Sequence, residues 1–171
     1  MVRDRLMASW AEFAPAEPAL ASRVQQRFDI RRHKTLATLR TDGSPRISGI
    51  EVEFADGEIF LGMMPGSRKL RDLERDPRLA LHSPTDDPPA GDPRGWAGEA
   101  KLAGYAREVD FPGSPVAGGR RFRIDISEAV LTHLNEAGDQ LVVESCFLGR
   151  EHIWDLRLIR EQLKQMGLDW D

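Results

Sequence analysis

The clearest hydrophobic and polar pattern in the chain lies between residues 36 and 83, where short apolar runs are separated by turn signals. Ile50, Val52 and Phe54 alternate with Glu51 and Glu53, and this period of two is typical of a strand with one buried face. Asp-Gly pairs at 42–43 and 56–57 favour hairpin turns, because glycine tolerates positive φ. The pattern predicts strands at residues 35–40, 46–54, 58–63 and 78–82, with a short helix over residues 68–75.

Helical spacing flanks this region on both sides. Leu20, Val24 and Phe28 recur every four residues and predict a helix over residues 17–28, after an irregular start that contains two prolines. Further strands are expected at residues 98–109, 121–126, 129–134 and 140–147, with a bend at Ser127 and Glu128 between the middle pair. From residue 150 onward the spacing is that of an amphipathic helix, set by Ile153, Leu156, Ile159, Leu163 and Met166.

Together these elements predict a mainly β protein, an antiparallel barrel with helices at its N-terminal and C-terminal ends. The length of 171 residues suits one domain. We expect it to consist of a helical lead-in at residues 1–34, a barrel at residues 35–148 and a C-terminal helix at residues 149–171.

Composition narrows the classes of function. A net charge of −4 argues against non-specific binding to nucleic acid, and no apolar run approaches the length of roughly 20 residues that a membrane span needs. The first residues have no apolar signal core behind them, and the single Cys146 excludes an internal disulfide. We therefore expect a cytoplasmic protein without nucleic-acid or membrane partners.

The strongest candidate for chemistry is the run Gly66-Ser67-Arg68-Lys69 at the start of the short helix. Ser67 is a candidate N-cap, and Asp76-Pro77 would end the helix. A helix start presents unpaired N–H groups, so Arg68 and Lys69 would complete a phosphate site there. The alternative is an ordinary solvated pair of basic residues on an exposed helix.

Two further candidates have equally simple alternatives. His82, at a strand end, is a candidate proton donor, or else a structural histidine. Residues 83–97 form a long loop rich in proline and aspartate, and Trp96 at its end could cover a ring or a dimer interface, or the loop could simply be flexible. Its aspartates do not fit a calcium loop, and the four histidines lack helical ligand spacing, so no metal site is expected.

The order of these motifs resembles the pyridoxamine 5'-phosphate oxidase-like split-barrel flavoproteins. The resemblance rests on four segments and continues loosely through residues 102–106 and 122–125; the segments are Ala37-Thr38-Leu39, Asp42-Gly43-Ser44-Pro45-Arg46, Gly66-Ser67-Arg68-Lys69 and Asp76-Pro77-Arg78. It implies an FMN-binding antiparallel split β-barrel that forms a homodimer, with residues of both subunits at each cofactor site.

The resemblance also implies a set of cofactor-binding residues. Arg68 and Lys69, beside Ser67, would hold the phosphate. The strand after Gly-x-Pro-Arg would touch the flavin ring, and the connection after the third strand would lie along the cofactor's sugar-like chain. The residues so implied, with Trp96 and Glu99 added near the ring, are Arg46, Ile47, Ser48, Gly49, Met63, Ser67, Arg68, Lys69, Trp96 and Glu99.

Departures from the family pattern change the expected reaction. The arginine and lysine that true pyridoxamine phosphate oxidases carry on the second strand are replaced here by Ser48 and Glu53, and their glutamine aligns with Glu99. Vitamin B6 oxidation is therefore not expected. We expect a flavin-dependent oxidoreductase that acts on an unidentified small molecule. The alternatives are a reductase that uses the deazaflavin coenzyme F-420, and a non-catalytic protein that binds flavin or haem, for which only His82 or His133 offers an axial ligand.

Overall fold

The computed structural model describes residues 7–146 and 150–168, and it is built around one antiparallel sheet of eight strands. The sheet order is β3-β2-β1-β4-β5-β6-β7-β8, and β3 also pairs with β6, so the first six strands close into a barrel. The predicted fold class is confirmed. The strands are β1 (His33–Leu39), β2 (Pro45–Ala55), β3 (Glu58–Met63), β4 (Arg78–His82), β5 (Glu99–Val109), β6 (Arg120–Leu134), β7 (Gln140–Ser145) and β8 (Arg150–Asp155).

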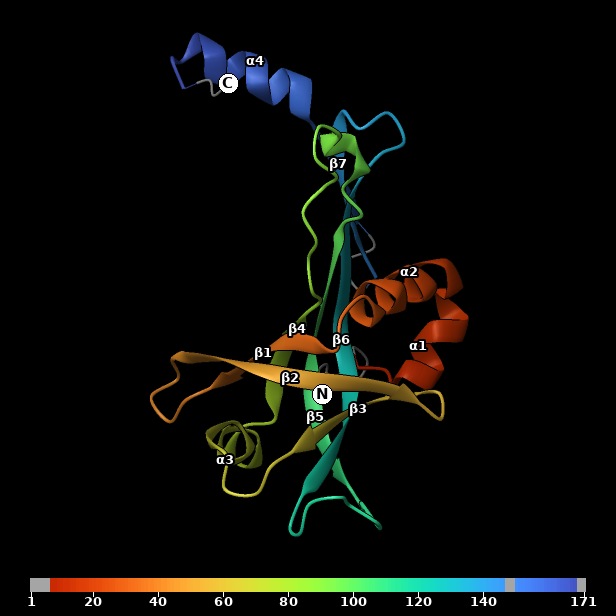
Figure 1. Ribbon diagram of the computed structural model, residues 1–171, viewed down its shortest axis with the longest axis vertical. Coiled ribbons are helices and arrows are strands. Elements are labelled where there is room, and N and C mark those ends of the chain that lie inside the picture. The colour runs from red at the N-terminus through yellow and green to blue at the C-terminus, as the bar shows by residue number, and fades with distance from the viewer. Residues whose placement is uncertain (1–6, 147–149, 169–171) are drawn as a thin grey trace, which may run out of the picture.

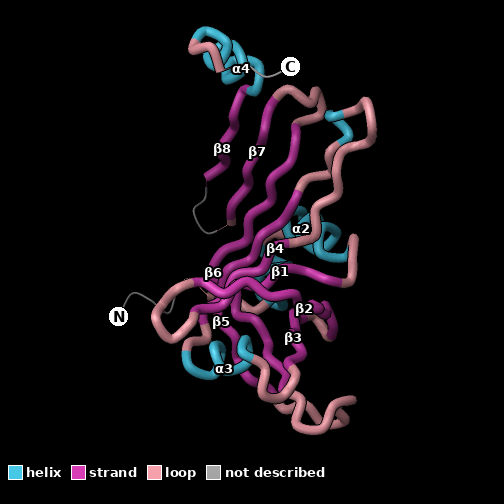
Figure 2. The backbone as a smooth tube through the Cα atoms, turned by 60° about the vertical axis from the view of Figure 1, so that its left-hand side comes forward, coloured by secondary structure: helices cyan, strands magenta, loops and turns pink. Residues whose placement is uncertain are grey.

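Strand β6 belongs to two parts of the sheet. Its first residues pair with β3 and close the barrel, whereas its last five residues pair with β7. Strands β7 and β8 therefore continue the sheet beyond the barrel, and they carry helix α4 (Leu156–Gln165) to the far end of the molecule (Figures 1 and 2).

The bend predicted at Ser127 and Glu128 is instead a β-bulge within one continuous strand. Ala103 pairs with Glu128 and Gly104 with Ile126, so Ser127 is the extra residue. A Cβ atom at Gly104 would lie 2.1 Å from the carbonyl oxygen of Asp125, which explains why only glycine fits beside the bulge. The sequence pattern could not distinguish a bulge from a turn, because both interrupt the alternation for one or two residues.

The N-terminal region is more regular than expected. Residues predicted to be irregular form helix α1 (Trp10–Ala16), which Ser9 caps by accepting a hydrogen bond from the Glu12 amide while the Glu12 carboxylate accepts one from the Ser9 amide. The predicted second helix is confirmed as α2 (Pro18–Asp29). The predicted boundary between lead-in and barrel is two residues late, because β1 already begins at His33.

The C-terminal prediction was wrong over its first six residues. A strand, β8, occupies residues 150–155, and the helix begins only at Leu156, after Asp155 caps it through the amides of residues 157 and 158. Trp154 is 43% exposed and so adds less buried area than expected, while Trp170 and the predicted strand end at Phe147 lie outside the described residues. None of the helices described is both long and apolar enough to cross a bilayer.

The core fills the barrel with side chains from alternate strand positions. Leu36, Ile59, Leu61, Leu102 and Ile124 have almost no exposed surface. One end of the barrel is covered by α1 and α2, where Trp10 packs against Phe13 and Phe54, with ring centroids 5.3 and 5.1 Å apart, and Phe28 lies 6.1 Å from Phe54.

Helix α3 (Arg68–Arg75) is fastened to the barrel by a buried polar cluster. Asp72, which is 3% exposed, accepts hydrogen bonds at its Oδ2 from Thr38 Oγ1 at 2.8 Å and from Arg46 Nε at 2.6 Å. Leu70 and Leu73 are buried on the same helix. Because a buried carboxylate is costly without partners, this cluster fixes the position of α3 over strands β1 and β2.

Replacing Asp72 tests how much this polar cluster stabilises the fold. We expect Asp72→Asn to lower the free energy of unfolding by about 3 kcal/mol, because Arg46 would become a largely buried cation without its carboxylate. Glu74→Gln, on the exposed side of the same helix, is the control and should change it by less than about 0.5 kcal/mol. Urea unfolding at neutral pH measures both.

The stability of the same variant should also depend on pH in a different way from that of the wild type. Hydrogen bonds from Arg46 and Thr38 hold the pKa of Asp72 below its ordinary value, against the opposing effect of burial. A lowered pKa in the folded state stabilises the protein fully above the ordinary aspartate pKa of about 4 and progressively less as the pH falls below it. The gap in stability between wild type and Asp72→Asn should therefore narrow below pH ~4. A gap that stays constant down to the acid transition would contradict this assignment.

Candidate functional site

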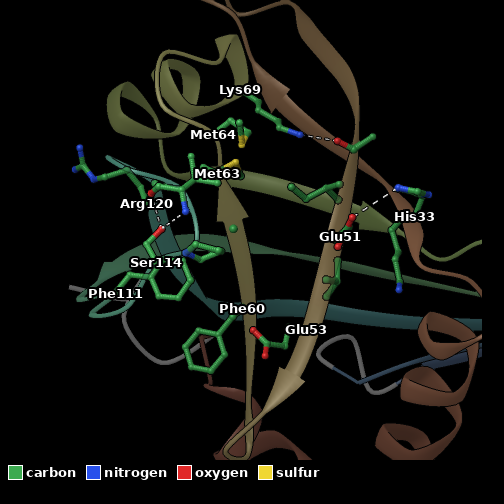
Figure 3. Close-up of a pocket in the computed structure, with 18 of the residues that line it drawn as sticks. His33, Glu51, Glu53, Phe60, Met63, Met64, Lys69, Phe111, Ser114 and Arg120 are labelled. Carbon is green, nitrogen blue, oxygen red and sulfur yellow. Dashed lines mark hydrogen bonds and ion pairs between the residues drawn. The ribbon is translucent and has the colours of Figure 1, made fainter.

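An open groove of about 590 Å³ lies on the outside of the barrel, over the junction of β2 and β3 (Figure 3). Outward-facing residues of both strands form its floor, α3 lies at one end, and the loop between β5 and β6 forms a wall. The groove therefore combines strand backbone, one helix start and one long loop.

The floor of the groove exists because β2 and β3 separate. They pair only from Val52 with Leu61 to Ala55 with Glu58, and the pairing of β3 with β6, from Phe60 to Met63, uses the other edge of β3. Residues 45–51 of β2 pair with β1 on one edge, and no strand within the described residues pairs with the other. Because backbone N–H and C=O groups need partners, this free edge can bind a ligand that carries amide-like groups.

Glycines keep the floor open. A Cβ atom placed at Gly49 or at Gly62 would meet no other atom within 4 Å, so the missing side chains leave space in the groove itself. Both glycines line the groove, one on β2 and the other on β3. The strand backbone is therefore accessible to a flat molecule lying across the two strands.

Lys69 is the cation that contacts this floor. Ser67 caps α3 by accepting a hydrogen bond from the Leu70 amide, as predicted, and the helix ends at Arg75 before Asp76. The Nζ of Lys69 then lies 2.6 Å from the carbonyl oxygen of Gly49 and donates to it. Burial lowers the pKa of Lys69, and no carboxylate pairs with its ammonium among the described residues.

The carboxylates in the groove are neutralised by arginines. Glu51 pairs with Arg32 at 2.9 Å, and Glu53 pairs with Arg121 at 2.8 Å. Lys34, which is 8% exposed, donates to the carbonyl oxygen of Arg32. Arg120 is itself paired with Glu108 and Glu74, so the excess of positive charge in the groove comes from Lys34 and Lys69.

An aromatic and arginine stack closes the end of the groove away from Lys69. The guanidinium of Arg121 lies 3.7 Å from the ring centroid of Phe60 and 5.3 Å from that of Phe111. Phe111 belongs to the loop of residues 110–119, which Ser114 shapes by accepting from the Val116 amide and donating to the Val116 carbonyl. This end offers an apolar surface next to a fixed cation.

No sequence motif pointed to this loop as part of the site. The loop that the sequence offered as a candidate was that of residues 83–97, through Trp96. An isolated aromatic residue inside a segment of glycine, proline and serine, as at Phe111, was the available signal. The register of β3 against β6 brings this loop to the groove, and the sequence does not reveal that pairing.

The predicted site residues fall into three groups in the structure. Gly49, Met63 and Lys69 line the groove. Arg46 and Arg68 line a separate hollow on α3, and Arg46 is held there by Asp72. These roles in cofactor binding remain predictions.

The remaining candidates lie outside the groove of this chain. Ile47 is 74% exposed, and Ser48 is next to it on β2. His82 and Glu99 lie together, with His82 Nε2 3.4 Å from a carboxylate oxygen of Glu99. Trp96 ends the loop of residues 83–97, which two contacts hold near α2: Arg31 pairs with Asp86, and Arg27 donates to the carbonyl oxygen of Ala97.

Comparison with known proteins identifies the fold. No family model matches the chain, and no curated protein matches it. Among solved structures, PhzG from Burkholderia lata 383 in complex with tetrahydrophenazine-1-carboxylic acid is 12% identical with a TM-score of 0.52, covering 84% of this chain and 91% of its own. ChuZ from Campylobacter jejuni is 10% identical with a TM-score of 0.54, covering 78% of this chain and 60% of its own.

A heme binding protein from Mycobacterium smegmatis gives a similar result. It is 16% identical with a TM-score of 0.52, covering 80% of this chain and 58% of its own. These neighbours belong to the pyridoxamine 5'-phosphate oxidase-like split-barrel superfamily. At such low identity the likeness establishes the split-barrel fold, and the use of the groove has to be argued from this chain's own residues.

The burial of Lys69 predicts a lowered pKa for its ammonium group. Its ammonium should titrate below the ordinary lysine pKa of about 10.4, because burial disfavours the charged form and no carboxylate compensates. NMR titration of isotopically labelled lysine side chains measures this pKa, and the signal missing from Lys69→Met assigns it. A bound phosphate should raise the pKa. Titration at or above the ordinary value in the free protein would contradict the burial of this group.

Proposed function

We propose that the groove binds FMN and that the protein is a flavin-dependent oxidoreductase acting on a small organic molecule. The observation that carries this proposal is the free edge of β2 at Gly49, with Lys69 donating to the Gly49 carbonyl beside it. One place thus combines open strand backbone and an unpaired cation, which are the two features that a flat heterocycle with a phosphate tail requires.

The residues of the groove fit the ring of such a cofactor. A flavin ring carries amide-like donors and acceptors along one side, which complement the backbone groups of residues 49–51. Gly49 and Gly62 leave the strand surface open to the ring. Phe60 and Phe111, next to Arg121, offer an apolar boundary that keeps water from one end.

The end of the groove at Lys69, away from Phe60 and Phe111, fits a phosphate. Lys69 is free of carboxylates, and its lowered pKa reflects a desolvated ammonium that gains most from an anionic partner. Glu51 and Glu53 do not oppose an anion, since each is already paired with an arginine. The resemblance also assigns Arg68 to this phosphate, whereas its side chain in the single chain lines the neighbouring hollow.

FMN, when bound, would supply the transfer of a hydride or of electrons. The protein's own contribution would be to hold the phosphate at Lys69, to align the ring on β2 and to limit access of water. A deazaflavin ring has the same flat shape, so an F-420-dependent reductase is the alternative with the same site. The substrate is not identified by these residues.

Haem binding through the two candidate histidines is disfavoured by their contacts. In His133, Nδ1 lies 2.8 Å from the carbonyl oxygen of Leu134 and Nε2 lies 2.7 Å from Glu144. In His82, Nδ1 lies 2.7 Å from the carbonyl oxygen of Ser83, and Nε2 faces Glu99. Either histidine would have to break such a contact to bind iron, which supports flavin over haem for these positions.

We further propose that two copies of the chain complete the site. Ile47 and Met64 are 74% and 58% exposed, and Met64 lines the groove while Ile47 lies two residues before Gly49. Exposed apolar side chains at the border of a groove favour contact with another protein surface. Trp96 and Glu99, both predicted to lie at the cofactor, are outside the groove of their own chain, which is the arrangement expected if a second copy contributes them.

Two substitutions, one in the floor of the groove and one at its cation, test the binding of the cofactor. Gly49→Leu should fold normally, because its Cβ has open space, and should weaken FMN binding at least tenfold by filling the floor. Lys69→Met should weaken FMN binding about tenfold, through loss of a charge-assisted hydrogen bond. Quenching of flavin fluorescence measures both affinities.

Matched control variants separate the loss of contacts with FMN from a general loss of folded structure. Ala80→Leu on β4 and Lys164→Met on α4 change residues that do not line the groove, so both should bind FMN like the wild type. Riboflavin lacks the phosphate and should bind equally to wild type and Lys69→Met. Equal FMN affinity in all five proteins would refute the assignment of this groove.

The dimer makes a separate prediction. Ile47→Asp should shift the chain from dimer to monomer in sedimentation equilibrium at micromolar concentration and should reduce FMN affinity as well, because a charge would replace an apolar contact. The control is Leu158→Asp on α4, which is also exposed but lies at the far end of the molecule (Figure 1). A wild-type protein that is monomeric throughout would exclude the shared site.

A further inference from the structure

The end of the groove away from Lys69 is lined by apolar side chains from two parts of the chain. Phe60 comes from β3, whereas Phe111, Pro115 and Val116 come from the loop of residues 110–119. Figure 3 shows Phe60 and Phe111 next to each other at this end. The proposed flavin ring would lie on residues 49–51 of β2, so this end of the groove remains for a second molecule beside the ring.

The two aromatic rings form a supported wall of the groove. The guanidinium of Arg121 lies 3.7 Å from the ring centroid of Phe60 and 5.3 Å from that of Phe111. Arg121 itself does not line the groove, and its side chain is only 20% exposed. The rings, rather than the guanidinium, therefore face the groove. Because aromatic rings prefer to pack against other flat rings, this wall favours an aromatic ligand.

The charged side chains at this end are already paired. Glu53, which lines the groove, pairs with Arg121 at 2.8 Å. Arg120, which also lines it, pairs with Glu108 and, at 3.4 Å, with Glu74. A charged ligand would lose its hydration here without gaining a free partner, or it would have to break one of these pairs. This end therefore favours an uncharged ligand, in contrast to the end at Lys69.

The loop that carries Phe111 is held in one shape by its own hydrogen bonds. The Ser114 amide donates to the carbonyl oxygen of Phe111 at 3.3 Å, and the Gly119 amide donates to that of Val116 at 2.9 Å. A Cβ atom at Gly119 would lie 2.6 Å from the Ser114 Oγ, so this turn requires glycine. A wall that is already ordered loses little conformational entropy when a ligand binds, which favours selective recognition.

We infer that this end of the groove is the substrate subsite, and that the substrate belongs to the class of flat, uncharged aromatic molecules. The substrate ring would pack on Phe60 and Phe111, and the paired charges at Glu53 would disfavour anionic analogues. The inference rests on the proposed flavin-dependent function, because it names the class of substrate for the same groove.

Calorimetric titration of the FMN-saturated protein at pH 7 tests the aromatic wall with two probes, 2-naphthol and 2-naphthoate. They share one ring system, but 2-naphthol is uncharged, since a phenolic hydroxyl ionises near pH ~10. The wild type should bind 2-naphthol saturably and at least tenfold more tightly than 2-naphthoate. Phe111→Leu keeps an apolar side chain without the ring and should weaken 2-naphthol binding about fivefold. Trp154→Leu, which removes an aromatic ring outside the groove, should bind both probes like the wild type.

The preference for an uncharged ring has its own test. Glu53→Gln leaves Arg121 without its carboxylate, so 2-naphthoate should bind about fivefold more tightly while 2-naphthol binding stays unchanged. Glu161→Gln on α4 removes the same charge far from the groove and should keep the preference of the wild type. An unchanged preference in Glu53→Gln, or an equal change in Glu161→Gln, would overturn the inferred selectivity.

Repeating the titrations without FMN separates this inference from the proposed function. Binding of 2-naphthol that depends on Phe111, in a protein that does not bind FMN, retains the aromatic subsite and rejects the flavin. FMN binding without saturable 2-naphthol binding, or with equal losses in Phe111→Leu and Trp154→Leu, rejects the subsite and retains the flavin. If 2-naphthol and FMN displace each other, the probe occupies the place of the cofactor and the inferred subsite is also rejected.

Discussion

The separation of β2 from β3 is the constraint on which the rest of the structure depends. The barrel closes because β3 pairs with β6 on the edge opposite to β2, while its pairing with β2 ends at Leu61. Because β3 pairs only with residues 52–55 of β2, residues 45–51 have one edge without a strand partner among the described residues. A free edge is costly when buried and invites unwanted pairing when exposed, so it has to be covered. In this chain one carbonyl of that edge accepts from Lys69, and the adjoining surface forms the floor of the groove.

Helix α3 controls what this edge meets. The Arg46–Asp72–Thr38 cluster fastens the helix to β1 and β2, and the helix then directs its basic residues to two sides. Lys69 faces Gly49 in the groove, and Arg71 faces the hollow on the other side. Arg68 lines the same hollow as Arg71, whereas Lys69 lines the groove. Two adjacent residues that form one phosphate motif in the sequence therefore lie in two different hollows. The position of one buried carboxylate decides this division.

Much of the fold follows from local patterns. The boundaries of β3, α3 and β4 were predicted to the residue, because strict alternation, an N-capping serine and an Asp-Pro pair are local signals. The tail was misread because Ile153 and Leu156 fit both helical spacing and a strand followed by a helix. The pairing of β8 with β7, which decides between them, is a tertiary contact. Ser127 was misread for the same reason, since its bulge depends on Gly104 in the neighbouring strand.

The site could be predicted only in part. Gly49 and Lys69, which line the groove, could be proposed from the sequence because they lie in recognisable segments, one in a strand after a turn and one at a helix start. Phe60, Phe111 and Arg121 were not, because the stack that they form joins β3, a loop and β6 through a register that no local pattern reveals. The pairing of Glu51 and Glu53 with arginines could not be predicted either, although it offsets the negative charge that these carboxylates bring to the groove.

The most direct test of the account is a crystal structure of the protein grown with FMN. We predict that the flavin ring lies along the free edge of β2 at residues 49–51 and that the phosphate is bound by Lys69. Residues of a second copy should complete the site. A structure in which the groove stays empty at saturating FMN, or in which FMN binds elsewhere on the chain, would contradict the central claim that the separation of β2 and β3 builds a cofactor site.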